Sequence, residues 1–334
     1  MSTSPTTIAY LTRDDIERFT GSHESILEAV ETGLKATASD DAVVEPTVYV
    51  KPQGAPGGMA TIRGAILSQG LIGIKTVGSY PDNRNKGLPP DPGFMALFDL
   101  ETGIPRALLD GAPITTIRTA AMTALGARYL ARSRSRVLAH IGARGIAAWG
   151  IRFLDSMFEL DEIRLLSRTR ESLDAAIDDF GNDLRAMIVR TDSWEDCVAD
   201  ADIVVDGSSR TEDAVLLPTS AIKPGATVIV YGAFSCFDDD VFGRIDKVFV
   251  DRWQDYSPGQ MGAMMCHMAR GHLTREGLSG FLGDLAVAGR RGRSSDDEII
   301  LFWHRGLAPC DITLANFFLD SAAQTGSGRV LPYP

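Results

Sequence analysis

The hydrophobic pattern near the start of the chain is helical. Apolar residues recur at intervals of three and four from Thr12 to Ala36. Thr12 and Asp15 have the spacing of an N-terminal capping box, in which each side chain accepts a hydrogen bond from the other residue's backbone N–H. We predict one amphipathic helix over Thr12–Ala36.

The pattern then changes to short β-branched or alternating runs broken by glycine and proline, which predict strands. These runs are Val43–Val50, Met59–Leu67, Gly70–Val77, Gly93–Asp99 and Gly103–Asp110. The stretch Ser79–Pro92 is dense in Pro, Asn, Asp and Lys and is expected to be a loop. An alanine-rich helix is predicted over Pro113–Ala131, because proline is tolerated near a helix start.

From Arg136 onward, predicted strands alternate with predicted helices. The strands are Val137–Ile141, Glu162–Ser167, Ala186–Val189, Ile203–Asp206, Ala226–Tyr231 and Lys247–Asp251. The helices are Ala143–Phe158, Arg170–Phe180 and Trp194–Ala199, and a last helix, Asp311–Gln324, is expected to return to the first domain. Such alternation predicts parallel pairing with right-handed crossovers. The fold class is therefore α/β, with a Rossmann-type doubly wound parallel sheet over residues 126–310 and an α+β domain over 1–125 with 311–334.

Composition narrows the functional classes. Lys and Arg number 33 against 44 Asp and Glu, which gives a net charge of −11 and disfavours nucleic acid or an anionic membrane as partner. No apolar stretch is long enough to span a bilayer, and the N-terminus lacks a secretory pattern. The cysteines are far apart, as in reduced cytoplasmic proteins. They are Cys197, Cys236, Cys266 and Cys310.

A glycine turn follows the strand that ends at Ile141. It reads Gly142-Ala143-Arg144-Gly145 and opens a predicted helix, which is the context of a dinucleotide-binding turn. Glycines there let backbone N–H groups approach a pyrophosphate at a helix N-terminus. Arg144 replaces the second glycine of the usual pattern, so it either clamps a phosphate or obstructs the cofactor. The alternative interpretation is a structural corner between strand and helix.

The next strand ends in Ser167-Arg168-Thr169. NAD sites usually have a carboxylate here for the ribose 2′-OH, whereas NADP sites offer cations and hydroxyls to a 2′-phosphate. The sequence thus favours NADP(H), with NAD(H) left open, and the alternative is a solvated turn. Asp206 and Ser208, at the end of a later strand, are expected to border the cofactor.

Four segments together resemble the ornithine cyclodeaminase/μ-crystallin family. They are Gly73–Val77 (GIKTV), Ile114–Ala121 (ITTIRTAA), the turn at Gly142, and Asp296–Asp311 with its DDEI and GLA motifs. The resemblance implies a homodimer whose N-terminal domain binds substrate and dimerises. It also implies hydride chemistry at the α-carbon of an amino or imino acid, with a bound nicotinamide.

Two cations match the family's site. Lys75 corresponds to its active-site lysine and Arg118 to its substrate-carboxylate arginine. A planar guanidinium can hold a carboxylate through two parallel hydrogen bonds, and a buried lysine with a lowered pKa can exchange a proton. The alternatives are a strand lysine that reaches solvent and a surface arginine at a helix end.

Two departures from the family bear on the chemistry. Val48 stands where relatives often have an arginine, and we hypothesise that Arg63 supplies the missing substrate-binding cation. Phe234 stands where cyclodeaminases place an aspartate that assists ammonia loss. The missing carboxylate argues against ornithine cyclisation.

The segment His304-Arg305-Gly306 is expected near the nicotinamide. His304 has a side-chain pKa suited to proton donation, although a histidine after Trp303 is also typical of packing. Gly306 is assigned to cofactor binding. No histidine or cysteine spacing indicates a metal site.

The sequence therefore predicts an NAD(P)H-dependent reductase or dehydrogenase that acts on a small α-imino or α-keto carboxylate. Its partner would be a small anionic substrate. Two alternatives stay open: a cyclodeaminase-type ammonia lyase with internally recycled NAD, and a non-enzymatic binding protein like some μ-crystallin relatives.

Overall fold

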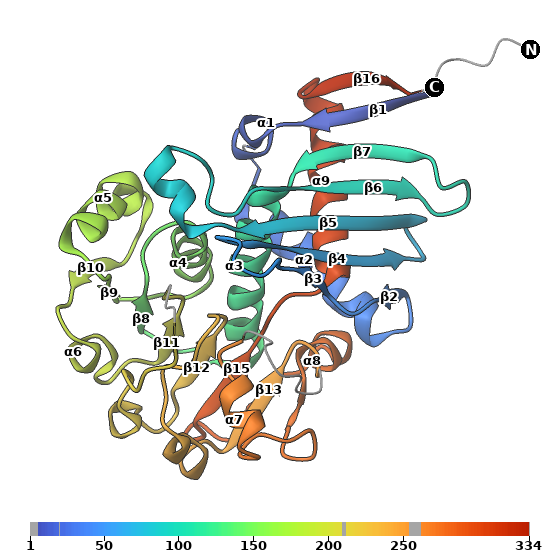
Figure 1. The fold of residues 1–334 in the computed structure, drawn as a ribbon. Coiled ribbons are helices and arrows are strands. Elements are labelled where there is room, and N and C mark those ends of the chain that lie inside the picture. Colours follow the sequence, from blue (N-terminus) through green and yellow to red (C-terminus); the bar gives the residue numbers. More distant parts are fainter. Residues whose placement is uncertain (1–5, 20, 209–211, 254–261, 334) are drawn as a thin grey trace, which may run out of the picture. The chain divides into compact units, whose positions relative to one another are not determined.

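The structure is a computed structural model that describes residues 6–19, 21–208, 212–253 and 262–333. The chain forms two compact units (Figure 1). Unit 1 comprises Met1–Arg118 and Leu307–Pro334, and unit 2 comprises Thr119–Gly306. The sequence instead places the two changes of domain at 125/126 and 310/311.

Unit 1 is built on one mixed sheet, in the order β16-β1-β7-β6-β5-β4-β2, with β3 also paired to β4. Its strands are β1 (Thr6–Leu11), β2 (Ala42–Val44), β3 (Val48–Val50), β4 (Gly58–Ile66), β5 (Leu71–Ser79), β6 (Gly93–Asp99), β7 (Pro105–Asp110) and β16 (Arg329–Tyr333). Its helices are α1 (Arg13–Glu17), α2 (His23–Ala38), α9 (Ala308–Thr325) and the first part of α3 (Gly111–Leu130), with a 3-10 turn at Pro81–Lys86.

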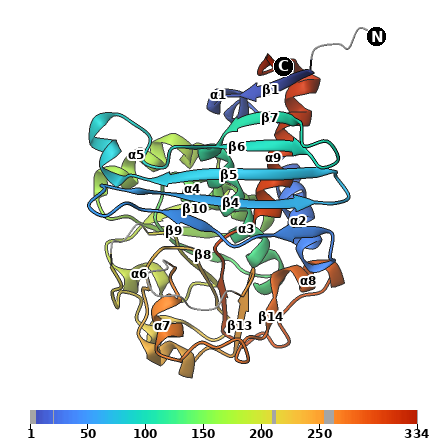
Figure 2. The same cartoon turned by 45° about the vertical axis from the view of Figure 1, so that its right-hand side comes forward.

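Helices α2 and α9 pack against each other, and α9 lies across β4, β5 and β6 (Figure 2). Gly33 of α2 permits this approach, because a Cβ there would lie 2.6 Å from the backbone of Pro309. On β5 every second residue faces α9, and Leu71, Gly73 and Lys75 are buried on that side. The C-terminal segment thus supplies both a helix and the edge strand β16 to unit 1.

Several predicted elements of unit 1 need correction. The single helix expected over Thr12–Ala36 is two helices, because Ser22 caps a second one after α1 ends. The capping box of Thr12 and Asp15 is confirmed at the start of α1. The strand expected over Val43–Val50 is two short strands, interrupted around Pro46. The sequence analysis missed β1 and β16.

Unit 2 is built on a sheet in the order β10-β9-β8-β11-β12-β15-β13-β14, and every pair that the structure describes in it is parallel. Its strands are β8 (Val137–Ile141), β9 (Glu162–Leu166), β10 (Met187–Arg190), β11 (Ile203–Asp206), β12 (Thr227–Val230), β13 (Lys247–Val250), β14 (Gly280–Phe281) and β15 (Ile300–Trp303). Its helices are α4 (Ile146–Met157), α5 (Arg170–Phe180), α6 (Trp194–Val198), α7 (Met265–Ala269) and α8 (Leu282–Ala288), with short 3-10 turns at Gly181–Asp183, Thr219–Ala221 and Asp239–Gly243.

The strand order reverses at β8, with β9 and β10 on one side and β11 and β12 on the other. Open α/β sheets bind ligands outside the carboxyl ends of the strands at such a reversal. The sequence analysis missed β15, which inserts between β12 and β13 although it comes after β13 in the chain. It also missed β14, α7 and α8.

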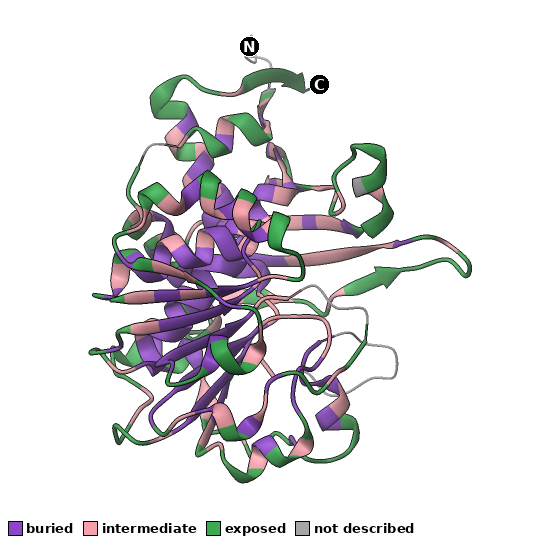
Figure 3. Cartoon of the chain, turned by 90° about the vertical axis from the view of Figure 1, so that its left-hand side faces the viewer, coloured by how far each residue is buried: buried purple, intermediate pink, exposed green. Residues whose placement is uncertain are grey.

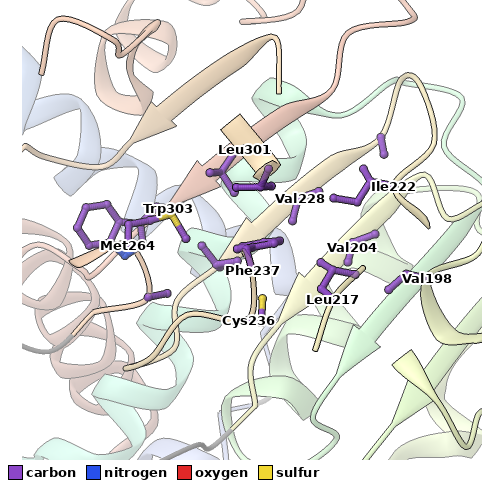
Figure 4. Packing of buried hydrophobic residues seen from close by; sticks show 14 of the residues in the cluster. Val198, Val204, Leu217, Ile222, Val228, Cys236, Phe237, Met264, Leu301 and Trp303 are labelled. Atoms are coloured by element: carbon purple, nitrogen blue, oxygen red, sulfur yellow. The ribbon is translucent and has the colours of Figure 1, made fainter. Parts of the chain in front are cut away.

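The core of unit 2 surrounds its central strands. Every residue of β11, β12 and β15 is buried, the state that Figure 3 colours purple. Figure 4 shows Val204, Val228 and Leu301 from these strands packed with Phe237 and Met264 of the following segments. Among the described helices, none is both long and apolar enough to cross a membrane.

Candidate active site

Three charged side chains of unit 1 form a buried cluster. Lys75 projects from β5, Arg118 from α3, and Asp311 from the first turn of α9. The Oδ1 atom of Asp311 accepts hydrogen bonds from Lys75 Nζ at 2.8 Å and from Arg118 Nε at 2.7 Å. The three side chains are 1%, 3% and 1% exposed, respectively. One buried carboxylate oxygen therefore holds both cations that the sequence analysis singles out.

In this desolvated cluster two cations share one carboxylate oxygen. Burial lowers the pKa of Lys75 to about 8, against the opposing effect of Asp311. Burial alone would raise the pKa of Asp311, but Arg118 and Lys75 outweigh it and hold that pKa below its usual value. Among the described residues, Asp311 Oδ2 has no hydrogen-bond partner. The lowered pKa of Lys75 suits that side chain to exchange a proton.

Arg63 lies on the opposite face of the sheet. In the antiparallel pairing of β4 with β5, Ile62 is opposite Lys75 and Arg63 is opposite Ile74. The Arg63 side chain is 39% exposed, and its Nη2 lies 3.9 Å from Glu45 Oε2. The structure does not bring Arg63 to Lys75, because a one-residue offset along a strand reverses the face. This corrects the hypothesis that Arg63 joins the same carboxylate site.

The glycine turn of unit 2 connects β8 to α4. Gly142 has φ +94°, and a Cβ there would lie 2.9 Å from the Gly207 carbonyl oxygen. Gly145, the N-cap of α4, has φ 61° and ψ −115°, and a Cβ there would meet nothing within 4 Å. The helix begins at Ile146 rather than at the predicted Ala143. The turn therefore needs glycine at both positions and leaves an open approach to the backbone at the helix start, which fits a dinucleotide pyrophosphate.

His140 supports this turn and was missed by the sequence analysis. It is fully buried, and burial lowers its pKa to about 4. The neutral ring donates a hydrogen bond from Nδ1 to the Gly142 carbonyl at 2.8 Å. The sequence did contain a signal for His140, because it is the polar residue in the otherwise apolar strand β8.

The segment after β9 lies beside the turn, because β8 and β9 are neighbours and Gly142 N donates to the Leu166 carbonyl at 2.8 Å. Ser167 is partly buried, and Arg168 is exposed. Thr169 caps α5 by accepting a hydrogen bond from Ser172 N. These positions contain no carboxylate.

The ends of β11 and β13 carry two further aspartates. Asp206 is buried, and its Oδ1 accepts from Ser208 N at 3.1 Å and from Ser208 Oγ at 2.7 Å. Asp251, which the sequence analysis did not single out, accepts from Gly306 N at 2.7 Å. Gly306 has φ +94°, a conformation that favours glycine. Both aspartates fix the backbone that follows a strand end.

His304 is fully buried at the end of β15. Its Nε2 lies 3.0 Å from Thr123 Oγ1, and its ring stacks on Phe302 with centroids 5.2 Å apart. The centroid of the Tyr231 ring lies 5.5 Å from that of His304. The Nε2 atom of His304 is thus engaged with Thr123, and its ring packs against two aromatic side chains. Within the described residues, no three His, Cys, Asp or Glu side chains group as metal ligands.

A parallel sheet with a glycine turn at its reversal, joined to a unit with a buried cationic cluster, defines an α/β protein of the dinucleotide-binding class. The chain belongs to the ornithine cyclodeaminase/mu-crystallin family, whose sequence profile matches residues 7–326. The resemblance and the fold class predicted from the sequence are confirmed.

Relatives and solved structures match over most of their lengths. The chain is 30% identical over 269 residues to a Delta(1)-pyrroline-2-carboxylate reductase of Paracoccus denitrificans, covering 79% of this chain and 84% of that protein. The Thermococcus litoralis Delta(1)-pyrroline-2-carboxylate reductase in complex with NADH and L-proline has a TM-score of 0.87 at 22% identity, covering 96% of this chain and 99% of that chain. An archaeal alanine dehydrogenase dimer with bound NAD has a TM-score of 0.86 at 23% identity, covering 98% and 100%. The two structures share the fold of this chain.

Proposed function

We propose that this oxidoreductase reduces a small α-imino or α-keto carboxylate, or oxidises the corresponding amino acid, with a nicotinamide cofactor. The observation that carries the proposal is the buried cluster in which Lys75 and Arg118 share one oxygen of Asp311. A substrate carboxylate would accept hydrogen bonds from the same two cations. The reductase and dehydrogenase named above act on compounds with a carboxylate beside the carbon–nitrogen bond, which supports the same substrate class.

The roles of the three residues follow from their chemistry. Arg118 would bind the carboxylate, since a guanidinium presents five N–H donors in a planar fork. Lys75 would give a proton to the nitrogen or oxygen of the reduced group, because a pKa of about 8 leaves it protonated yet acidic enough near neutral pH. Asp311 would act as a positioning residue that holds both cations through one oxygen.

The cofactor proposal rests on unit 2. The turn from Gly142 to Gly145 would hold the pyrophosphate at the start of α4, and Asp206, Ser208 and Gly306 are proposed to border the dinucleotide. When bound, the nicotinamide supplies or accepts the hydride. The absence of a carboxylate in Ser167–Thr169 favours NADP(H) over NAD(H).

A turnover assay tests the function. The protein is incubated with NADPH or NADH and a panel of keto acids with amines and cyclic imino acids, while reduced nicotinamide and ammonia are both measured. We expect stoichiometric cofactor oxidation. Ammonia release from ornithine with no net cofactor change would instead establish the lyase, and failure to bind either dinucleotide would establish a non-enzymatic protein.

A matched pair of variants links the assay to the cluster. Arg118→Lys keeps the charge but loses the planar fork, so we expect the KM of the carboxylate substrate to rise roughly ten-fold or more, the scale of one charge-assisted hydrogen bond. Arg128→Lys on the same helix is the control and should leave the KM unchanged. Equal KM values for the two variants would contradict the role of Arg118.

We also propose a cytoplasmic homodimer. The four cysteines are free thiols, which suits a reducing compartment. Apolar side chains at the sheet's edges in unit 1 are exposed, with Val50 of β3 at 60% and Val330 of β16 at 73%. Sedimentation equilibrium should give twice the chain mass of 36.0 kDa.

A further inference from the structure

A polar pocket of about 450 Å³ opens in unit 1 at one end of the sheet. Strand β1 lies between β7 and β16 there, with Leu11 opposite Leu109 and Tyr10 opposite Arg329 (Figure 1). The volume falls in the range of about 300–1,000 Å³ that is typical of small-molecule sites. The charged residues that line the pocket are Arg13, Arg18, Arg329, Asp14, Asp15 and Asp110.

Two of these residues project from the face of the sheet opposite to Lys75. Leu109 shares the face of Lys75, because one residue of β6 stands opposite both. Asp110 follows Leu109 in β7, so its side chain projects from the other face. Arg329 is on the face of Asp110, because its partner in β1 stands opposite Leu108, two residues earlier in β7. The pocket is therefore separate from the buried cluster around Lys75.

Hydrogen bonds of two aspartates hold the walls of the pocket together. Asp15 Oδ2 accepts from Thr12 N at 2.9 Å in the capping box that begins α1. Asp15 Oδ1 accepts from Gly328 N at 3.3 Å, next to the start of β16. Asp110 Oδ1 accepts from Ala112 N at 2.9 Å in the first turn of α3. The segments that line the pocket are thus fixed before any ligand binds.

The pocket places opposite charges beside each other without joining them by hydrogen bonds. Arg13 Nε lies 3.7 Å from Asp110 Oδ2. Arg18 Nη2 lies 3.6 Å from Asp14 Oδ2, and both distances exceed hydrogen-bond length. The side chain of Arg329 is exposed and has no ion pair or hydrogen bond with any residue that the structure describes. Guanidinium donors and carboxylate oxygens are therefore available to a ligand.

The mixture of charges decides which ligand fits. Three guanidinium groups disfavour a ligand that is only cationic, and three carboxylates disfavour one with several negative charges. An α-amino acid carries a carboxylate and an ammonium group on one carbon, so both can meet an opposite charge where Arg13 and Asp110 lie 3.7 Å apart. We infer that the pocket is a second binding site, which takes a small α-amino acid as a zwitterion. The ligand's carboxylate accepts from Arg13 and Arg329, and its ammonium group donates to Asp110.

Calorimetry with three probes tests the charge requirement. The full chain, without cofactor, is titrated with L-alanine, with N-acetyl-L-alanine, which lacks the ammonium group, and with L-alaninamide, which lacks the carboxylate. We expect L-alanine to bind at least about ten-fold more tightly than either analogue, since each analogue loses charge-assisted hydrogen bonds. Equal affinity of L-alanine and an analogue, or no saturable binding of L-alanine, would overturn the inference.

Variants locate the bound amino acid. Arg329→Gln and Asp110→Asn should each weaken L-alanine binding about ten-fold or more, and the asparagine keeps the acceptor for Ala112. Arg106→Gln removes an exposed cation that pairs with Asp99 on the same sheet, so this control should bind as the unaltered protein does. Circular dichroism checks that each variant is folded. Unchanged binding in both pocket variants would show that the site is wrong.

The buried cluster around Lys75 is the competing location for an amino acid. Arg118→Lys should keep a binding event that Asp110→Asn loses, because Arg118 belongs to the cluster and does not line the pocket. Binding of L-alanine that is lost in Arg118→Lys and kept in Asp110→Asn would place the amino acid in the cluster and overturn the second site.

The second site does not depend on the proposed function, and the two fail in different ways. A protein that binds L-alanine in the pocket and oxidises neither reduced dinucleotide keeps the site and contradicts the reductase. A protein that turns over its substrate and shows no binding event sensitive to Arg329→Gln keeps the reductase and contradicts the site.

Discussion

Lys75 Nζ and Asp311 Oδ1 lie 2.8 Å apart in the core of unit 1, although 236 residues separate them along the chain. The same oxygen accepts from Arg118 Nε, so the aspartate determines where both cations stand. A buried ion cluster of this kind is a weak source of net stability, because desolvation opposes the attraction. Under the proposed function, the cluster is present to bind the substrate carboxylate rather than to stabilise the fold.

Removal of the Asp311 carboxylate should show how strongly the buried cluster depends on it. Asp311→Asn leaves two buried cations without their anion, which we expect to lower the free energy of unfolding by about 3–5 kcal/mol. Urea unfolding at pH 7 measures the loss. Asp320→Asn, at an exposed position of the same helix α9, is the control and should change stability little. Similar losses for both variants would mean that Asp311 does not hold the cluster.

The proton of Lys75 should set the alkaline limb of the reaction. Burial lowers its pKa to about 8, so the protonated form dominates below that pH and disappears above it. We expect kcat/KM in the reductive direction to fall as the pH rises through about 8. Because Asp311 raises the pKa of Lys75, the limb should move to lower pH in Asp311→Asn. A profile that stays level to about pH 10, near the ordinary pKa of a lysine, would exclude Lys75 as the proton donor.

Gly142 should tolerate substitution less than a glycine that has only a positive φ. Gly54, with φ +76°, has nothing within 4 Å of the position that a Cβ would take, so Gly54→Ala should cost about 1–2 kcal/mol from backbone strain alone. Gly142→Ala adds a contact of 2.9 Å with the Gly207 carbonyl. We expect it to cost more stability and to weaken dinucleotide binding, as measured by urea unfolding and calorimetry. Equal costs would show that the loop moves aside.

His140 should make the protein less stable in mild acid. Its pKa is about 4 when folded and 6.5 in its ordinary state, so the unfolded chain binds more protons between these values. The free energy of unfolding should therefore fall as the pH drops from about 6.5 to about 4, by about 3 kcal/mol from this group. His140→Asn, which keeps a donor for Gly142, should reduce that fall. His272→Asn, at a half-exposed side chain, should retain it.

Sequence patterns predicted the bounds of a helix or strand correctly where those bounds depend on the element's own residues. Strand Val137–Ile141, helix Arg170–Phe180 and strand Ile203–Asp206 have the predicted bounds, because hydrophobic runs and local caps define them. The capping box of Thr12 is equally local. Strand Ile300–Trp303 was missed, since it follows an acidic segment and its burial comes from β12 and β13 on either side.

The candidate site likewise has features that the sequence indicated and features that only tertiary packing decided. Residue type and local spacing indicated the glycine turn and the cation-bearing strand end, and the resemblance to the family's motifs singled out Lys75 and Arg118. Only the tertiary structure decided that Asp311 joins them, that Arg63 faces away and that His304 is buried. Those outcomes depend on which face of a sheet a helix covers and which strands become neighbours, and long-range packing sets both.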